Sequence, residues 1–171
     1  CMISFTNDIT APSVSLEGKS FWIVRSLPVK TFDILKAKLE LHIILTSVPL
    51  LICSIIISAV INMPVLYSVL TVVLTQVTVL LSALFGLYMN VLKPNLNWAN
   101  ETAVVKQSLC VFLNLFGGWC YTIVTFGAYW FMRKAVNVSL YMLIFTLISS
   151  AFCVLLYRLL KTNGVKRIEA L

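Results

Sequence analysis

Four long apolar stretches limit how this chain can fold more than any other feature of its sequence. They cover residues 41–62, 65–92, 108–131 and 138–160, and no Asp, Glu, Lys or Arg lies within their cores. A helix rises 1.5 Å per residue, so about 20 apolar residues cross the hydrocarbon core of a bilayer, which is about 30 Å thick. None of the stretches alternates like a barrel strand. The sequence therefore predicts an all-α, polytopic transmembrane helical bundle with about four full spanning helices.

The composition supports lipid as the solvent. Only 11% of the 171 residues are charged and 60% are hydrophobic, whereas soluble domains carry about 25% charged residues. The net charge of +7 comes from basic residues that lie between the apolar stretches. This distribution is typical of orientation signals and contacts with lipid headgroups, and it predicts membrane lipid and no nucleic acid as a partner.

The connections between the stretches predict the orientation in the membrane. Eleven of the 13 basic residues lie in or beside residues 12–40, the loop 93–107 and the tail 161–171, and only Arg133 and Lys134 lie in the connection at the other side. The positive-inside rule places the larger group in the cytoplasm. We therefore expect a multi-pass protein of the cell membrane with a cytoplasmic C-terminus. Residues 1–11 would be the inner end of a preceding transmembrane helix.

Residues 12–40 are predicted to be a cytoplasmic amphipathic segment. In its second half, spacings of three and four place four residues on one face of a helix: Phe32, Leu35, Leu39 and His42. Thr31 is expected to cap this helix, and a second short element precedes Pro28. Two helical pieces at the membrane surface would either transmit force from a cytoplasmic partner into the spanning helix at Leu41 or act as a passive interfacial anchor.

Few residues are candidates for chemistry. The five cysteines show no CxxC spacing, and the single histidine, His42, has no ligand partners nearby and is expected to be interfacial. The triplet Gly18-Lys19-Ser20 ends like a phosphate-binding loop, but Ser13 stands where that loop requires glycine, and no strand precedes it. We expect no catalytic residue, metal site or cofactor, and therefore no enzyme. Thr75, Gln76 and Thr78 would either line a translocation path or bond neighbouring helices.

Three motifs carry a family resemblance that extends over essentially the whole chain. They are SLEGKSFWIVRSLPV followed by LKAKL, LKPNLNWANETAVVKQS between two spanning stretches, and the tail YRLLKTNGVKRIEAL. With them the chain resembles the C-terminal part of ABC exporter permeases of Gram-positive bacteria, the ABC-2-like family.

The resemblance implies a permease that moves a substrate out of a bacterial cell by alternating access, driven by a separate ATP-hydrolysing subunit. It also implies the rest of the permease, or a second copy, as a partner. A coupling segment at residues 17–28 would contact the ATPase through Glu17, Phe21, Trp22, Arg25, Leu27 and Pro28, assigned by location only. The alternative is a non-transporting membrane scaffold or sensor, whose basic segment binds lipid or a regulatory partner.

Overall fold

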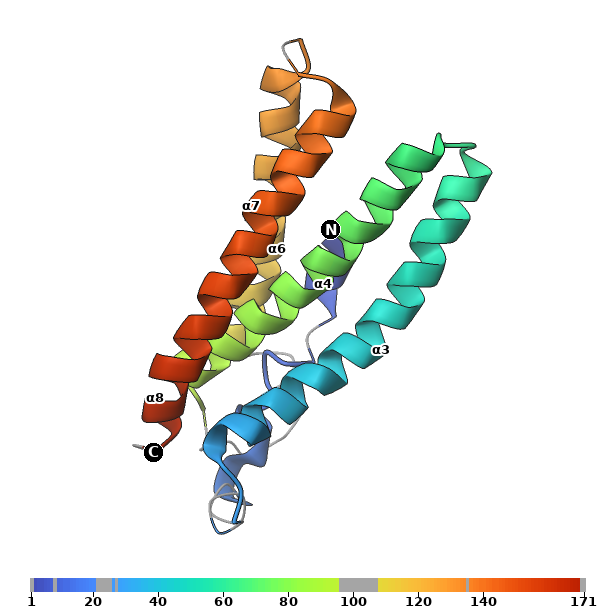
Figure 1. Cartoon of the computed structure of the whole chain (residues 1–171). Coiled ribbons are helices and arrows are strands. Elements are labelled where there is room, and N and C mark those ends of the chain that lie inside the picture. The colour runs from blue at the N-terminus through green and yellow to red at the C-terminus, as the bar shows by residue number, and fades with distance from the viewer. Residues whose placement is uncertain are drawn as a thin grey trace.

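The computed structural model is built mainly of helices in the residues that it describes (Figure 1). The described residues are 2–7, 9–20, 26, 28–95, 108–134 and 136–169. Within them, four helices are long and apolar enough to cross a membrane, which confirms the predicted fold class. These helices are α3 (Thr31–Val60), α4 (Val65–Leu92), α6 (Leu109–Met132) and α7 (Val138–Leu159). The shorter elements are α1 (Met2–Thr6), η1 (Ser15–Ser20), η2 (Leu160–Gly164) and α8 (Val165–Glu169).

The first spanning helix begins earlier than the apolar pattern indicates. α3 is continuous from Thr31 and continues through Pro49, so the amphipathic residues 31–40 and the apolar residues after them form one helix. Lys30, and not Thr31, is the N-cap residue, and its side chain makes no capping hydrogen bond. The helix is continuous because Leu35, Leu39 and His42 form a single buried face with the turns that follow.

The four long helices form two hairpins that diverge from a common end. Figure 1 shows the α3–α4 hairpin leaning away from the α6–α7 hairpin toward the two connecting turns. Consistent with this, the buried residues of α4 all lie in its second half, between Thr78 and Val91. The hairpins are therefore held together near the start of α3 and the end of α4.

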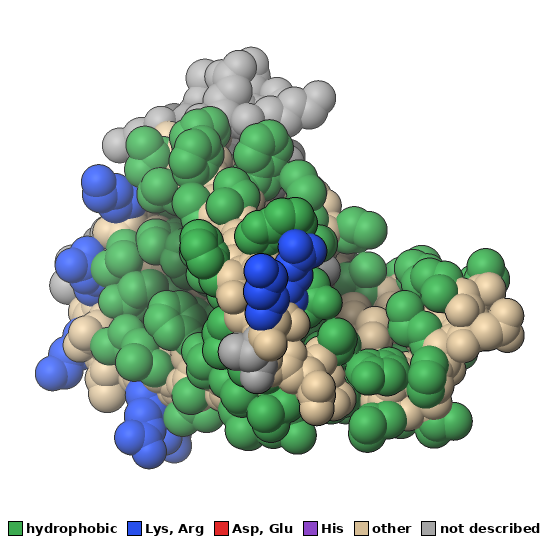
Figure 2. All heavy atoms as spheres, turned by 90° about the horizontal axis from the view of Figure 1, so that it is seen from above, with side chains coloured by type: hydrophobic (Ala, Val, Ile, Leu, Met, Phe, Trp, Pro, Cys, Tyr) green, Lys and Arg blue, Asp and Glu red, His purple; other side chains and the backbone are tan. Residues whose placement is uncertain are grey.

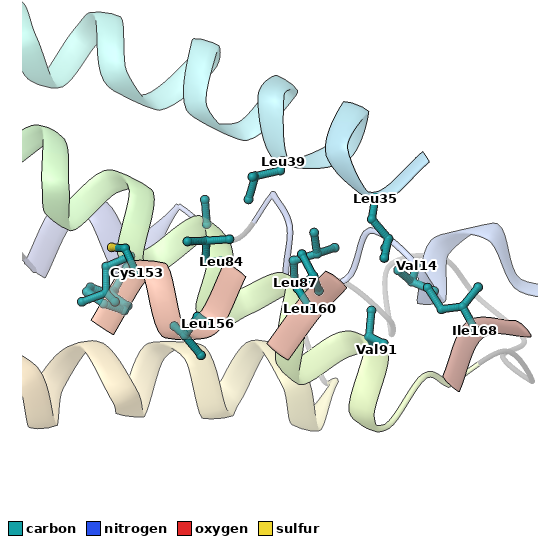
Figure 3. Packing of buried hydrophobic residues seen from close by; sticks show 13 residues of the cluster. Val14, Leu35, Leu39, Leu84, Leu87, Val91, Cys153, Leu156, Leu160 and Ile168 are labelled. Carbon is teal, nitrogen blue, oxygen red and sulfur yellow. The ribbon is translucent and has the colours of Figure 1, made fainter. Parts of the chain in front are cut away.

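The hydrophobic core lies at this joined end. Leu84 and Leu87 of α4 face Leu156 of α7 and Leu160 of η2, and all four are buried (Figure 3). The chain continues from α7 through η2 into α8, where Ile168 is buried and Arg167 Nη1 donates a 3.0 Å hydrogen bond to the Leu92 carbonyl. The basic tail is thus a helix that packs on the end of α4, because it has an apolar face of its own.

The outer surfaces of the hairpins are apolar. Hydrophobic side chains cover most of the face in Figure 2. Large side chains remain 74% exposed at Val60 and 86% exposed at Phe131, beside the two connecting turns. Contiguous exposed apolar surface of this extent marks an interaction with membrane or protein, and four spanning helices identify the membrane as the surrounding medium.

α1 packs against α6 through a glycine. A Cβ added at Gly118 would overlap Phe5 Cβ, whereas a Cβ added at Gly127 would meet nothing within 4 Å. The Phe5 ring also lies 5.7 Å from the Tyr121 ring, between ring centroids. The small residue therefore allows α1 to approach α6 closely, as small residues do in membrane bundles.

Gly118→Ala should lower the free energy of unfolding by about 1–3 kcal/mol, because the added methyl group must displace Phe5. Thermal unfolding of the purified protein in detergent measures this as a lower melting temperature. Gly127→Ala is the matched control and should leave the melting temperature unchanged or slightly raised. Equal effects of the two substitutions would contradict the packing described for α1.

Candidate functional site

Two of the predicted contact residues for a partner ATPase lie in the described part of the chain, at the joined end of the hairpins. Glu17 lies in η1 and Pro28 is exposed just before α3. Phe21, Trp22, Arg25 and Leu27 lie outside the described residues. Residues 2–7 and 9–17, which lead into this region, are called the N-terminal segment below.

The N-terminal segment is bound to the start of α3. Lys38 Nζ lies 2.6 Å from Glu17 Oε1 and donates a 2.7 Å hydrogen bond to the Ser13 carbonyl. One turn further along α3, His42 Nδ1 lies 3.2 Å from Thr10 Oγ1, within hydrogen-bond distance. His42 is fully buried, so it is not the interfacial residue that the sequence suggested.

The same segment is bound to the end of α4. Asn90 donates from Nδ2 to the Ala11 carbonyl, and its Oδ1 accepts a 3.0 Å hydrogen bond from the Ser15 backbone N–H and a 3.3 Å one from Ser15 Oγ. Asn90 is fully buried. Gly86, one turn earlier, lets the segment approach, since a Cβ there would lie 3.3 Å from the Ala11 nitrogen.

The pair between Glu17 and Lys38 is well shielded from water. The Glu17 side chain is 20% exposed and the Lys38 side chain 19%, whereas Lys36 and Glu40, which also pair, are 53% and 56% exposed. Solvent and salt therefore screen the Glu17–Lys38 pair less than the Lys36–Glu40 pair. Removing one partner of such a pair leaves a charge with reduced hydration. Glu17 is therefore directed toward α3 within the chain, and its contact with a partner stays a prediction.

The other end of the N-terminal segment is bound to α6 and to the middle of α4. Asn114 Nδ2 of α6 donates to the Phe5 carbonyl at 3.5 Å. Ser4 Oγ lies 3.5 Å from Thr78 Oγ1 of α4. The segment therefore contacts both hairpins. Its beginning contacts α6 and α4, and its end contacts α4 and α3.

The residues considered for a translocation path make contacts within the bundle. Thr75 and Thr78 donate to the carbonyls of Thr71 and Thr75 at 2.8 Å, which is the usual way that hydroxyls are satisfied in membrane helices. Gln76 Nε2 donates to the Ser47 carbonyl of α3 at 3.4 Å. The Gln76 contact joins α4 to α3, whereas these hydroxyl bonds of Thr75 and Thr78 stay within α4.

An apolar groove lies between the two hairpins. It has a volume of about 290 Å³ and is lined by residues of α1, α4, α6 and α7, among them Phe5, Phe85 and Phe152. The hydroxyl groups at its wall, Tyr121 OH and Ser149 Oγ, lie 2.9 Å apart and bond each other. The groove therefore offers shape and apolar surface, and its polar groups are already paired.

Sequence reasoning missed the residues that fix the N-terminal segment. Thr10, Lys38 and Asn90 carry no local motif, and their contacts join residues that are 32, 25 and 79 positions apart. The one available signal was Asn90 itself, a strongly polar side chain near the end of a long apolar stretch. Such a residue in a membrane helix normally faces the protein interior and has a partner there.

The fold and this site define a polytopic membrane protein in which a largely irregular N-terminal segment, which begins with the short helix α1, is held between two helical hairpins. A comparison with family models matches residues 1–126 to the family described as "Putative ATP-binding cassette". The match covers most of the chain, so the chain belongs to this ABC-related family. It is a different family from the ABC-2-like permeases. Comparisons with curated proteins and with solved structures gave no match.

Asn90→Leu should destabilise the fold, because it leaves the Ala11 carbonyl and the Ser15 N–H without their partner. The expected loss is about 1–3 kcal/mol for each buried group left unsatisfied. Asn95→Leu is the matched control, since the Asn95 side chain is exposed and its backbone N–H, which donates to Ser15 Oγ at 3.0 Å, is retained. Thermal unfolding in detergent would separate the two variants, and similar melting temperatures would contradict the role given to Asn90.

Proposed function

We propose that the chain is a permease subunit of an ABC-type exporter, which moves a substrate across the cell membrane with energy from a separate ATPase subunit. The observation that carries this proposal is the combination of the ABC family match with four spanning helices in one chain. An ABC system needs both a membrane pathway and an ATPase. This sequence supplies the first and contains no phosphate-binding loop.

The family description names ATP binding, and the Gly18-Lys19-Ser20 triplet ends like a phosphate-binding loop. A phosphate-binding loop lies between a strand and a long helix. Here the triplet ends the short element η1, and no strand occurs in the described ranges. Gly18 has φ 46° and ψ −126°, a backbone conformation that favours glycine and that accounts for the residue without a nucleotide. These features favour ATP hydrolysis on another chain.

The joined end of the hairpins is the proposed cytoplasmic side. The start of α3, the end of α4 and α8 meet there, and so do the exposed basic residues Lys36, Lys93 and Lys166. Arg133 and Lys134 lie at the far end, in the turn between α6 and α7. This separation follows the positive-inside rule and supports a cell-membrane protein with a cytoplasmic C-terminus.

A non-transporting scaffold or sensor remains the second candidate. The observation that favours it is the satisfaction of Thr75, Gln76 and Thr78 within the bundle, since these were the polar groups available for a path. A scaffold would keep its lipid or protein partner without an associated ATPase. The two candidates therefore differ in what accompanies the purified chain.

The double variant Phe21→Asp with Trp22→Asp should release the ATPase subunit, because two charges replace the apolar side chains of the proposed coupling segment. The affinity-tagged chain would be purified from membranes of its host, and the eluate would be assayed for ATP hydrolysis and for a band labelled by azido-ATP. The wild type should retain both signals, and the variant should lose most of each.

The matched control is Thr162→Asp with Asn163→Asp, an adjacent exposed polar pair in η2 at the joined end, which adds the same two charges without replacing lipid-facing side chains. It should keep the ATPase and a comparable yield of folded protein. Retention of the ATPase by the Phe21 and Trp22 variant would overturn the coupling assignment. Absence of any ATPase from the wild-type eluate would favour the scaffold.

Single cysteines at positions 93 and 134, in a variant without the native cysteines, test the orientation. A membrane-impermeant maleimide added to intact cells should label position 134 and spare position 93, because Lys93 is placed in the cytoplasm. After the cells are opened, both positions should react. Labelling of position 93 alone in intact cells would reverse the proposed orientation.

A further inference from the structure

We propose that the N-terminal segment is a mechanical link: it carries movement of the coupling segment to both hairpins through the Glu17–Lys38 pair and Asn90. This inference rests on the proposed function and adds to it. Glu17, Lys38 and Asn90 act in it as positioning residues that need not touch the ATPase or the transported substrate.

The segment is attached to both hairpins at separate places. Its beginning is held on α6, where Phe5 packs at Gly118. Its end is held on the other hairpin, by Asn90 of α4 and by Lys38 of α3. Val14, between these attachments, points into the core near Leu35 of α3 (Figure 3). A displacement of this segment therefore acts on both hairpins at once.

The hairpins are arranged so that such a displacement would change the angle between them. Burial in α4 is confined to its second half, and the turns at the far ends lie apart in Figure 1. The N-terminal segment runs from the middle of α4 to the joined end, so its attachments at Asn90 and Lys38 lie close to the vertex of the two hairpins. A small shift at a vertex becomes a larger movement at the far ends, as in hinge motions of other proteins.

The attachment point of the coupling segment is well defined. Glu17 is the last residue of the N-terminal segment and the first of the proposed coupling segment, residues 17–28. Its partner Lys38 lies in the second turn of the continuous helix α3 and also holds the Ser13 carbonyl. Because α3 is one continuous helix from Thr31 to Val60, with Pro49 inside it, a movement passed to Lys38 is carried along the same element toward the far turn.

Two polar atoms at this junction indicate that its present arrangement is not fully satisfied. Glu17 Oε2 and His42 Nε2 are buried, and neither makes a hydrogen bond within the described part of the chain. Leaving a buried polar group without a partner costs about 1–3 kcal/mol. A second arrangement that satisfies these atoms would recover part of that energy, which suits an element that alternates between two positions.

The test reverses the charges of the proposed link and then exchanges them. Spin labels at Val60 and Phe131, near the two far turns, report the distance between the hairpins in the complete complex with its ATPase. The distance is measured without nucleotide and after trapping with ATP, Mg²⁺ and vanadate. The wild type should show a distance change on trapping. Glu17→Lys alone and Lys38→Glu alone should each lose most of that change while the ATPase stays bound.

The exchanged pair, Glu17→Lys with Lys38→Glu, should restore more than half of the change, because the opposite charges face each other again. The matched control reverses the exposed pair of the same helix, Lys36→Glu and Glu40→Lys, singly. Each of these should respond like the wild type. Asn90→Leu, if it folds, should weaken the response, since it releases the N-terminal segment from α4.

The outcomes separate this inference from the proposed function. If the wild type responds and the single reversals at 17 and 38 respond equally, or if the exchange fails to restore the response, the link is overturned. Loss of the ATPase from Glu17→Lys would also overturn it, since Glu17 would then contact the partner directly. A wild-type complex that binds no ATPase overturns the proposed function itself, and the link with it.

Discussion

The backbone of the N-terminal segment must find hydrogen-bond partners inside an apolar bundle, and the rest of the structure depends on this requirement. Non-helical backbone is tolerated at such a place only where protein groups or water satisfy it. Asn90 supplies a donor and an acceptor to Ala11 and Ser15, and Lys38 supplies a donor to Ser13. Satisfying the segment therefore fixes the end of α4 against the start of α3.

This requirement also explains why packing is concentrated at one end. The buried side chains of α4 and the hydrophobic core gather where the N-terminal segment, α3, α7 and α8 meet. Toward the far turns each hairpin has fewer protein neighbours, and lipid becomes the solvent of side chains such as Val60 and Phe131. Since lipid tails are as apolar as leucine, no hydrophobic driving force closes the hairpins there. The two hairpins can therefore stay apart near the far turns without any further contact that holds them in that position.

The sequence predicted the spanning helices well, because the requirement for apolar residues acts locally. The second stretch, 65–92, and α4 cover the same residues. The start of α3 was placed at Leu41 because charged residues precede it, yet most of those charges, at Asp33, Lys36 and Glu40, lie on the exposed face while Leu35 and Leu39 continue the buried one. The N-terminal segment could not be predicted, because its contacts join residues far apart in the sequence. Asn90 and Lys38 become recognisable as its partners only in the folded state, where they bond its backbone.

The same contacts bear on how the polar residues of the spanning helices are interpreted. In a transporter, polar groups in the membrane suggest a substrate path, but here Asn90, Asn114 and Thr78 contact the N-terminal segment instead. A path built from the same helices would have to use other surfaces, and the space between the diverging hairpins is bounded by the apolar groove at Phe85 and Phe152. A substrate recognised there would be selected by shape and apolar area. The strong polar interactions of this chain serve its internal geometry.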